Sequence, residues 1–162
     1  MVFFKPPFSI PTLSLILSFD PISSNNVKEK IDPYLRPLYD ALDDMIPADK
    51  LGYYMSTRTI EIAPLAYMRG RTLDNAFIIL DESQNANDLQ IKMFLTRIGM
   101  HSRAVIEGDP YQSDLPLSMR GAMMDVQDKL TGLMGVGVCQ LQATDIVRNP
   151  IIGRVLERLE NR

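Results

Sequence analysis

The segment Phe77–Asn85, FIILDESQN, constrains the fold of this chain more than any other. Four apolar residues run directly into two adjacent carboxylates, Asp81 and Glu82. This pattern predicts a strand that is buried on both faces of a sheet and ends abruptly at charged residues. In an open parallel α/β sheet, ligands bind beyond the carboxyl ends of the strands, so the two acids would face a crevice. The alternative is a buried strand followed by a solvated acidic turn.

A second segment, Ala104–Pro116, repeats this layout with AVIEGDPYQSDLP. Its short apolar run is followed by Gly108, Asp109 and Gln112. Between the two segments, Asn87 and Gln90 have the spacing of a capping box, so they predict the start of a helix. Two strands joined by a helix form a βαβ unit and place both polar ends on one rim of the sheet.

At such a rim, an Asp-Glu pair is typical of a Walker B element. The first acid of that element holds Mg²⁺ on a nucleotide, and the second orients or deprotonates a water molecule. Asp81 is therefore the candidate metal ligand, and Glu82 is the candidate catalytic residue.

Five blocks extend this pattern and occur in one order along the chain: IDPYLRPLYDAL at 31–42, IEIAPLAYMRGRTL at 60–73, FIILDESQN, IKMFLTRIG at 91–99 and GDPYQSDLP. Together, over roughly residues 26–159, they closely resemble the PhoH family of P-loop ATPases, which are relatives of superfamily-one helicases. The resemblance implies an α/β fold, a RecA-like P-loop NTPase three-layer sandwich with a mostly parallel sheet. It also implies binding and hydrolysis of ATP with Mg²⁺, and a link to RNA metabolism.

The resemblance further implies a role for each residue at the rim. Asp81 would hold Mg²⁺ through a water molecule, and Glu82 would polarise the attacking water. Gln112 would sense the γ-phosphate, and Arg148 would stabilise the charge of the transition state. Further nucleotide contacts are implied for Gln84, Asp109, Arg69 and Arg71.

The arginines are also candidate functional residues on chemical grounds, apart from the resemblance. Arg69 and Arg71 flank Gly70, and a guanidinium group matches phosphate oxygens bidentately. A solvated turn is the alternative. Arg148 stands just before a helix predicted to begin at Asn149-Pro150, where a positive charge is unfavourable. This placement favours a functional role over that of an ordinary surface arginine.

No G-x-x-x-x-G-K-[ST] motif, the phosphate-cradling Walker A loop, occurs in the 162 residues. In the PhoH family this loop lies N-terminal to the block at 31–42, where residues 1–25 of this chain show no resemblance. We therefore divide the chain into a non-matching segment 1–25, expected to be an edge strand or disordered, and a core 26–162 that lacks the first βα unit. Alternatively, Leu13–Phe19 fills part of the gap as a substitute strand.

Three functions stay open at this point. The chain could be an ATPase half whose P-loop comes from another polypeptide, and the expected assembly is with a P-loop-bearing PhoH-like chain or as a homo-oligomer. It could be a non-catalytic module that docks on a full-length PhoH-like protein or on RNA, although a net charge of −3 gives no global attraction to RNA. It could also be a gene fragment that barely folds.

The remaining features predict an ordinary globular domain without a membrane partner. Its single cysteine, Cys139, allows no internal disulfide, so a reducing cytoplasm is expected. The apolar run 8–19 is too short to span a bilayer, which takes about 20 residues. Apolar stripes predict packed helices over 118–134 and from 149 to 159, and a last strand over 136–141 that buries Cys139.

Overall fold

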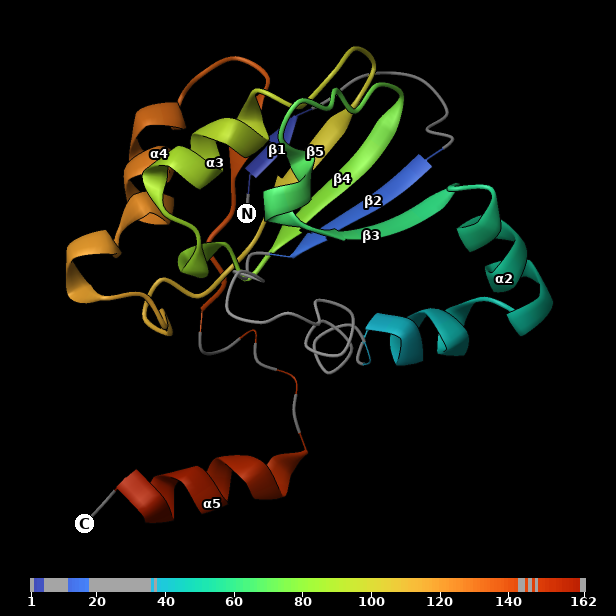
Figure 1. Cartoon of the computed structure of the whole chain (residues 1–162). Helices are drawn as coiled ribbons and strands as arrows, with labels where there is room; N and C mark the ends of the chain where they lie inside the picture. Colours follow the sequence, from blue (N-terminus) through green and yellow to red (C-terminus); the bar gives the residue numbers. More distant parts are fainter. Residues whose placement is uncertain are drawn as a thin grey trace.

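The computed structural model describes residues 2–4, 12–17, 36, 38–142, 145, 147 and 149–160. Its strands belong to one sheet of six, in the order β3-β2-β4-β5-β1-β6 (Figure 1). The strand bounds are β1 Val2–Phe4, β2 Thr12–Leu17, β3 Ile60–Pro64, β4 Ala76–Asp81, β5 Arg103–Ile106 and β6 Val136–Val138. The helix bounds are α2 Ala48–Ser56, α3 Asp88–Leu95, α4 Ala122–Leu130 and α5 Pro150–Glu160, with short 3-10 turns η1 Leu65–Met68, η2 Ser83–Asn85 and η3 Leu117–Met119.

Four strands, β3, β2, β4 and β5, pair in parallel, as expected of the α/β fold. β1 differs, because it runs antiparallel to both of its neighbours, β5 and β6. The sheet is therefore mostly parallel and has one short antiparallel strand near its far edge.

The placement of β2 corrects the expectation for residues 1–25. Thr12–Leu17 does not lie at an edge of the sheet, because β2 pairs with β3 on one side and β4 on the other. Ser14 and Ile16 are 1% exposed. A strand from this segment thus contributes to the core, in agreement with the alternative of a substitute strand. The division of the chain at residue 25 stays a prediction.

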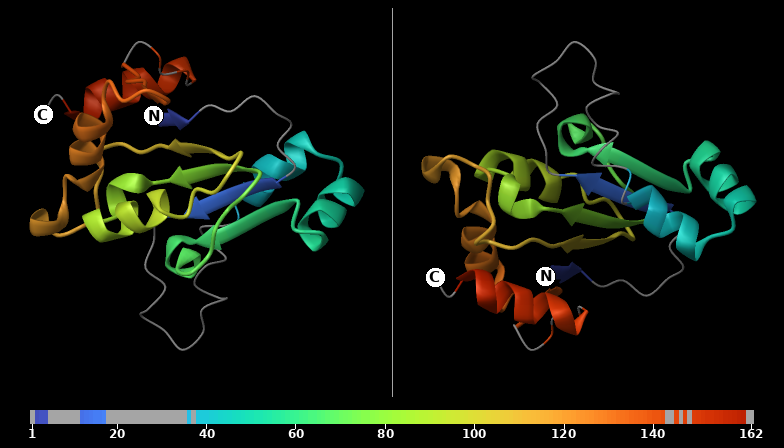
Figure 2. Two further views of the ribbon diagram at one scale, coloured as in Figure 1. Left: turned by 90° about the horizontal axis from the view of Figure 1, so that it is seen from above. Right: turned by 90° about the horizontal axis from the view of Figure 1, so that it is seen from below.

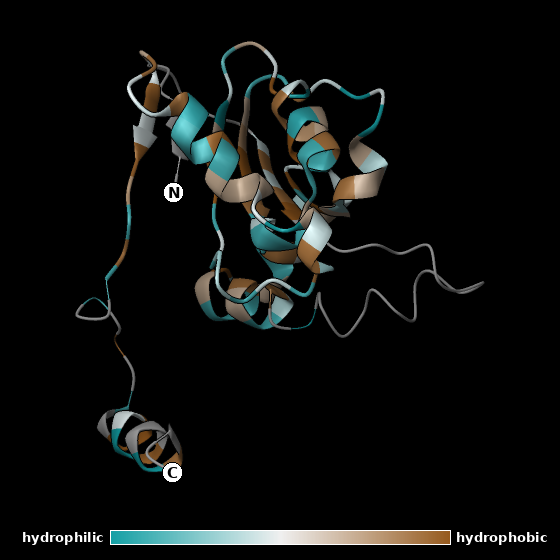
Figure 3. Ribbon diagram, turned by 90° about the vertical axis from the view of Figure 1, so that its left-hand side faces the viewer, coloured by the Kyte–Doolittle hydropathy of each residue, from teal (hydrophilic) through white to brown (hydrophobic). Residues whose placement is uncertain are grey.

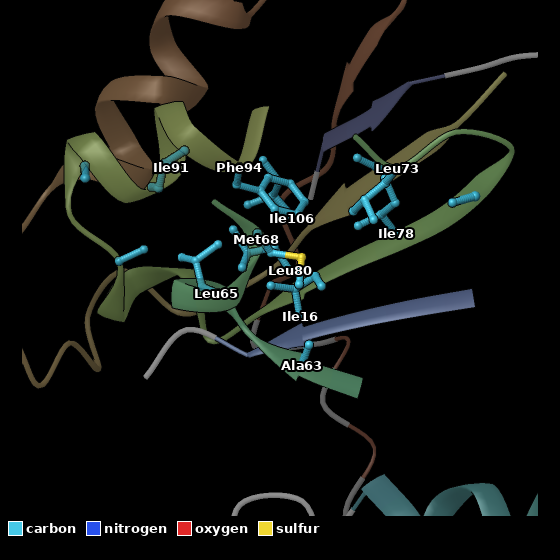
Figure 4. Packing of buried hydrophobic residues seen from close by; sticks show 14 residues of the cluster. Ile16, Ala63, Leu65, Met68, Leu73, Ile78, Leu80, Ile91, Phe94 and Ile106 are labelled. Atoms are coloured by element: carbon cyan, nitrogen blue, oxygen red, sulfur yellow. The ribbon is translucent and has the colours of Figure 1, made fainter. Parts of the chain in front are cut away.

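Two apolar clusters, one on each face of the sheet, make the three layers. The larger lies beneath η1, α3 and α4 and includes Ile78, Leu80 and Phe94, all fully buried (Figure 4). The smaller brings Leu15 and Ile60 against Leu42 and Leu51, which come from the helical residues 38–45 and from α2. Figure 2 shows these helical segments and α3 on opposite sides of the sheet.

Side chains alternate between the two faces along β4. Ile78 and Leu80 are fully buried, whereas Phe77 and Ile79 are half-buried. The expectation of burial on both faces is therefore correct for one face and too strong for the other, where the covering cluster is smaller.

The helix after β4 begins as predicted. Asn87 Oδ1 accepts the Gln90 N–H at 3.0 Å, and Gln90 Oε1 accepts the Asn87 N–H at 2.9 Å, so the capping box is complete. Ile91 and Phe94 then point into the larger cluster. Through this cap, α3 begins close to the end of β4.

The C-terminal part differs from its predictions. α4 is shorter than the predicted range 118–134. Met119, which precedes the helix, and Leu133, which follows it, are both exposed. β6 ends at Val138, and Cys139 is exposed rather than buried. α5 forms, but Ile151 and Val155 are about half exposed, and the helix lies apart from the sheet (Figures 1 and 3). No helix in the described part of the chain has the length and apolar character needed to cross a bilayer.

Candidate functional site

The carboxyl ends of β4 and β5 bring acidic side chains together. Leu80 is in register with Ile106, and the next residues along the two strands are Asp81 and Glu107. Parallel neighbours in register point to the same face of a sheet. Burial, and after it the negative charges of Asp81 and Glu82, raise the pKa of Glu107 above its ordinary value. The sequence analysis did not select Glu107, although its position directly before Gly108 in the second segment was a usable signal.

Glu82 turns the chain away from the strand. Its backbone has φ 54° and ψ 36°, in the left-handed region that residues other than glycine rarely adopt. Such a conformation costs about 1–3 kcal/mol and persists where the surroundings fix it. The Glu82 N–H donates to Asp81 Oδ1 at 2.8 Å, which ties the two candidate acids to each other.

Gln84 lies between the two polar loops and is only 6% exposed. Its Nε2 donates to Glu82 Oε2 at 2.6 Å, and its Oε1 accepts the Asp109 N–H at 3.1 Å. The side chain is therefore engaged at both ends by the protein itself. Each end of the amide keeps one further hydrogen-bonding position, but at this low exposure little of it is open to a nucleotide.

Backbone contacts lock the same two loops together. The Ser83 N–H donates to the Glu107 carbonyl at 3.0 Å, and Ser113 Oγ donates to the Gln84 carbonyl at 2.8 Å. The Asp114 N–H donates to Asn85 Oδ1 at 2.8 Å. The loops after β4 and β5 thus form one bonded unit.

Gly108 is required by the closeness of this packing. A Cβ added there would collide with Gln84 Oε1 and lie 3.0 Å from Ser83 Oγ. The Ser83 hydroxyl is fully buried and has no hydrogen-bond partner among the described residues.

The second loop presents Gln112 to solvent. Asp109 Oδ2 accepts Gln112 Nε2 at 2.7 Å, and Asp109 Oδ1 accepts the Tyr111 N–H at 2.9 Å. The Asp109 carboxylate therefore shapes its own loop. Its contribution to the rim is the placement of Gln112.

Arg71 does not join this unit. Its terminal guanidinium nitrogens Nη1 and Nη2 donate to the Glu61 carboxylate, at 2.8 and 2.7 Å. This hydrogen bond is the main reason that the pKa of Glu61 lies below its ordinary value. Glu61 is in register with Ser14, which is in register with Ile78. Ile78 precedes Asp81 by three residues, a distance of about 10 Å along β4. The sequence prediction of a phosphate-gripping Arg71 missed this partner, because the return of the turn after η1 onto Glu61 of β3 is not visible in the local sequence.

Arg69 is exposed in the turn that contains Gly70, whose φ is 78°. Arg148 lies outside the described residues. Of the predicted site residues, the structure brings together Asp81, Glu82, Gln84, Asp109 and Gln112.

The rim suits a hard cation held through phosphate and water rather than a protein cage. Asp81 is a partly exposed carboxylate, the kind of oxygen ligand that Mg²⁺ uses once or twice per site while keeping several waters. Within the described residues, no group of three or more His, Cys, Asp or Glu side chains is arranged to hold a metal ion.

Comparisons with known proteins identify the sequence. A family model described as PhoH-like protein matches residues 16–160. The chain is 50% identical over 132 residues to the PhoH-like protein of Bacillus subtilis, covering 82% of this chain and 41% of that protein. It is 46% identical to the PhoH-like protein of Synechocystis over 83% of this chain and 41% of that protein, and 39% identical to Protein PhoH of Escherichia coli over 81% and 38%. The chain thus spans about two fifths of the length of these relatives.

Proposed function

The chain belongs to the PhoH-like protein family, and on this premise we propose that it supplies the acidic half of a site that binds and hydrolyses ATP with Mg²⁺. The observation that carries the proposal is the bonded unit at the ends of β4 and β5. It holds Asp81, Glu82 and Gln112 at one rim of a parallel sheet, which is where ligands bind in folds of this class.

Each residue of the unit has a distinct task in this proposal. Asp81 holds Mg²⁺ through a water molecule, and a bound ion neutralises charge on the phosphate oxygens. Glu82, which is exposed, accepts a hydrogen bond from the attacking water and aligns it. Gln112 donates to the γ-phosphate from the exposed loop, and Arg148 stabilises negative charge in the transition state.

The arginine pair contributes differently from what the sequence implied. Arg71 is held by Glu61 at a distance from the rim, so we assign it to anchoring the turn at Gly70. The exposed Arg69 keeps its proposed contact with phosphate, either of the nucleotide or of an RNA backbone.

The phosphate cradle has to come from residues other than these 162, which contain no G-x-x-x-x-G-K-[ST] motif. Charge-assisted hydrogen bonds contribute about 1.5–3 kcal/mol each, so three missing contacts cost about 4.5 kcal/mol or more. This is over a thousandfold in affinity. We therefore propose that a P-loop-bearing PhoH-like polypeptide completes the site, and that the reaction takes place in a reducing compartment such as the cytoplasm.

Docking on such a polypeptide without catalysis is the second candidate function. The observation in its favour is the apolar surface of the C-terminal part, where Leu141, Val155 and Leu159 are 76%, 46% and 67% exposed. The relatives are about twice as long as this chain, so a PhoH-like partner has the additional residues needed to cover this surface.

A calorimetric titration of Mg²⁺-ATP into the purified chain tests the proposal. We expect binding weaker than about 1 mM for the chain alone, because the cradle is missing. We expect ATP hydrolysis when the chain is mixed with a PhoH-like relative that carries the P-loop but has its own Walker B aspartate replaced by alanine. Asp81→Ala should abolish this activity, and Asp128→Ala, an exposed acid on α4, should leave it unchanged.

Two outcomes would contradict the proposal. Tight binding by the isolated chain that Asp81→Ala does not weaken would show that ATP binds elsewhere. Stable association of the two chains without restored hydrolysis would favour the docking function.

A further inference from the structure

The side chain of Gln84 links Glu82 to Asp109 by two hydrogen bonds. This arrangement suits a residue that transmits a displacement between its two partners, rather than one that binds a ligand. We propose that Gln84 is a positioning residue, whose side-chain amide sets the Glu82 carboxylate according to the position of the Asp109–Gln112 loop. The inference rests on the proposed function, because it concerns the residue assigned to align water and the residue assigned to the γ-phosphate.

The amide is a bridge with one permitted orientation. Nε2 donates to a carboxylate oxygen of Glu82, and Oε1 accepts a backbone N–H at Asp109. A flipped amide would face the carboxylate with an acceptor and the N–H with a donor, so both contacts would become repulsive. The two hydrogen bonds therefore fix each other.

The far end of the bridge is coupled to Gln112. The Asp109 residue that donates its N–H to Gln84 also accepts Gln112 Nε2 on its carboxylate at 2.7 Å. A ligand that pulls on Gln112 therefore pulls on Asp109, and the displacement reaches Glu82 through one planar amide. Glu82 is sensitive to such a displacement, because its own backbone is in the left-handed region and its side chain is exposed.

The packing reserves this place for the amide. Gly108 has no room for a Cβ, and the atom it would strike is Gln84 Oε1. The Ser113 hydroxyl holds the Gln84 carbonyl at 2.8 Å, so the backbone of the bridge is also fixed. Because Gln84 is 6% exposed, its side chain is shielded from a nucleotide while Glu82 and Gln112 are not.

The test compares two substitutions of Gln84 with a matched control. Gln84→Met keeps the length of the side chain and removes both hydrogen bonds. Gln84→Glu keeps an acceptor for the Asp109 N–H and replaces the donor to Glu82 with a like charge. Gln90→Met makes the same chemical change in the capping box of α3, outside the bridge.

The first measurement needs no ATP. In the full chain, the ¹³C signal of the Glu82 carboxyl carbon is recorded with and without Gln112→Ala. We expect Gln112→Ala to shift this signal in the wild-type and Gln90→Met backgrounds, and to leave it unmoved in Gln84→Met and Gln84→Glu. An equal shift in all backgrounds, or none in the wild type, overturns the proposal. If Gln84→Met does not fold, Gln84→Glu decides.

The second measurement is ATP hydrolysis in the mixture with the P-loop-bearing relative. Loss of an aligned water predicts a fall in kcat of about tenfold or more for both Gln84 variants, with KM for ATP unchanged within about twofold. A rise in KM at constant kcat would instead make Gln84 a nucleotide ligand. If the wild-type mixture hydrolyses no ATP, the proposed function fails, while the carboxyl signal still decides whether the bridge couples the two loops.

Discussion

The loops at the ends of β4 and β5 contrast with the C-terminal part formed by β6 and α5. In the loops, most buried polar groups form hydrogen bonds with one another, and the Ser83 hydroxyl is the exception. Gln84 and Ser113 are buried, and both form hydrogen bonds within the unit. In the C-terminal part, apolar side chains face solvent, among them Met134 and Val147 at 96% exposure each. The first region forms hydrogen bonds mainly within itself, whereas the second exposes apolar side chains to solvent.

The difference separates what this chain supplies from what it requires. Hydrogen bonds among buried polar groups restrict the motion of the two loops, so these loops can hold Asp81, Glu82 and Gln112 in a defined arrangement. Exposed apolar surface of this kind marks an interaction site in soluble proteins. We therefore expect substitutions in the first region to act on the folding and activity of the chain, and those in the second to act on association.

Paired leucine substitutions should give the largest contrast. Leu80→Ala removes a fully buried side chain from the larger cluster and should lower the free energy of unfolding by about 3 kcal/mol. Leu159→Ala, on α5, should change it by less than about 0.5 kcal/mol, because that side chain is 67% exposed. Urea denaturation of the isolated chain measures both values. A loss for Leu159→Ala comparable to that for Leu80→Ala would mean that α5 is packed in solution.

Two glycine substitutions should have stability effects of intermediate size and opposite sign. Gly108→Ala places a methyl group against Gln84 Oε1 and should cost about 1–3 kcal/mol of stability. Gly153→Ala meets nothing within 4 Å and should favour helix in α5 by about 1 kcal/mol.

Urea denaturation measures the effect at Gly108, and amide hydrogen exchange of residues 151–160 measures the effect at Gly153. Neutral behaviour of Gly108→Ala would show that the two loops are not locked as described.

The ion pair between Arg71 and Glu61 should give the smallest effect. Both side chains are partly exposed, so Glu61→Gln should cost only about 0.5 kcal/mol at neutral pH. The pKa of Glu61 is lowered in the folded state, so this contribution is present above the ordinary value of 4.5 and is lost as pH falls through the lowered value. The stability difference between wild type and Glu61→Gln, measured by urea denaturation across this range, should therefore shrink on acidification. A difference that grows on acidification would contradict the assigned sign.

The sequence was sufficient where the determining contacts are local. The capping box of Asn87 and Gln90 spans three residues, and the strand that ends at Asp81 is a contiguous apolar run, so both could be predicted. The placement of the loops after β4 and β5 on one rim also followed, because parallel strands joined by one helix have their carboxyl ends on the same side of the sheet.

The sequence was insufficient where distant segments meet. The interior position of β2 depends on pairing with residues 60–64 and 76–81, and no pattern within residues 12–17 specifies those partners. The contact of Glu61 with Arg71 was missed because it depends on how the turn after η1 folds back on β3. The exposure of Cys139 and Ile151 was mispredicted because an apolar stripe indicates which face seeks burial, and not whether a neighbouring surface is available.

The antiparallel strand β1 has a consequence for the order in which the sheet assembles. Val2 pairs with Ile106 and Val138, and Phe77 pairs with Arg103. The sequence separation between Phe77 and Arg103 is about a quarter of that between Val2 and Ile106. Closing a loop four times as long costs about 1.2 kcal/mol more in chain entropy. Only the three residues of β1 form the contacts that offset this cost. During synthesis, β1 emerges before both of its neighbours, β5 and β6. Until β1 pairs with β5, the edge of β5 is unpaired, and a strand from another polypeptide can compete for it while folding is in progress.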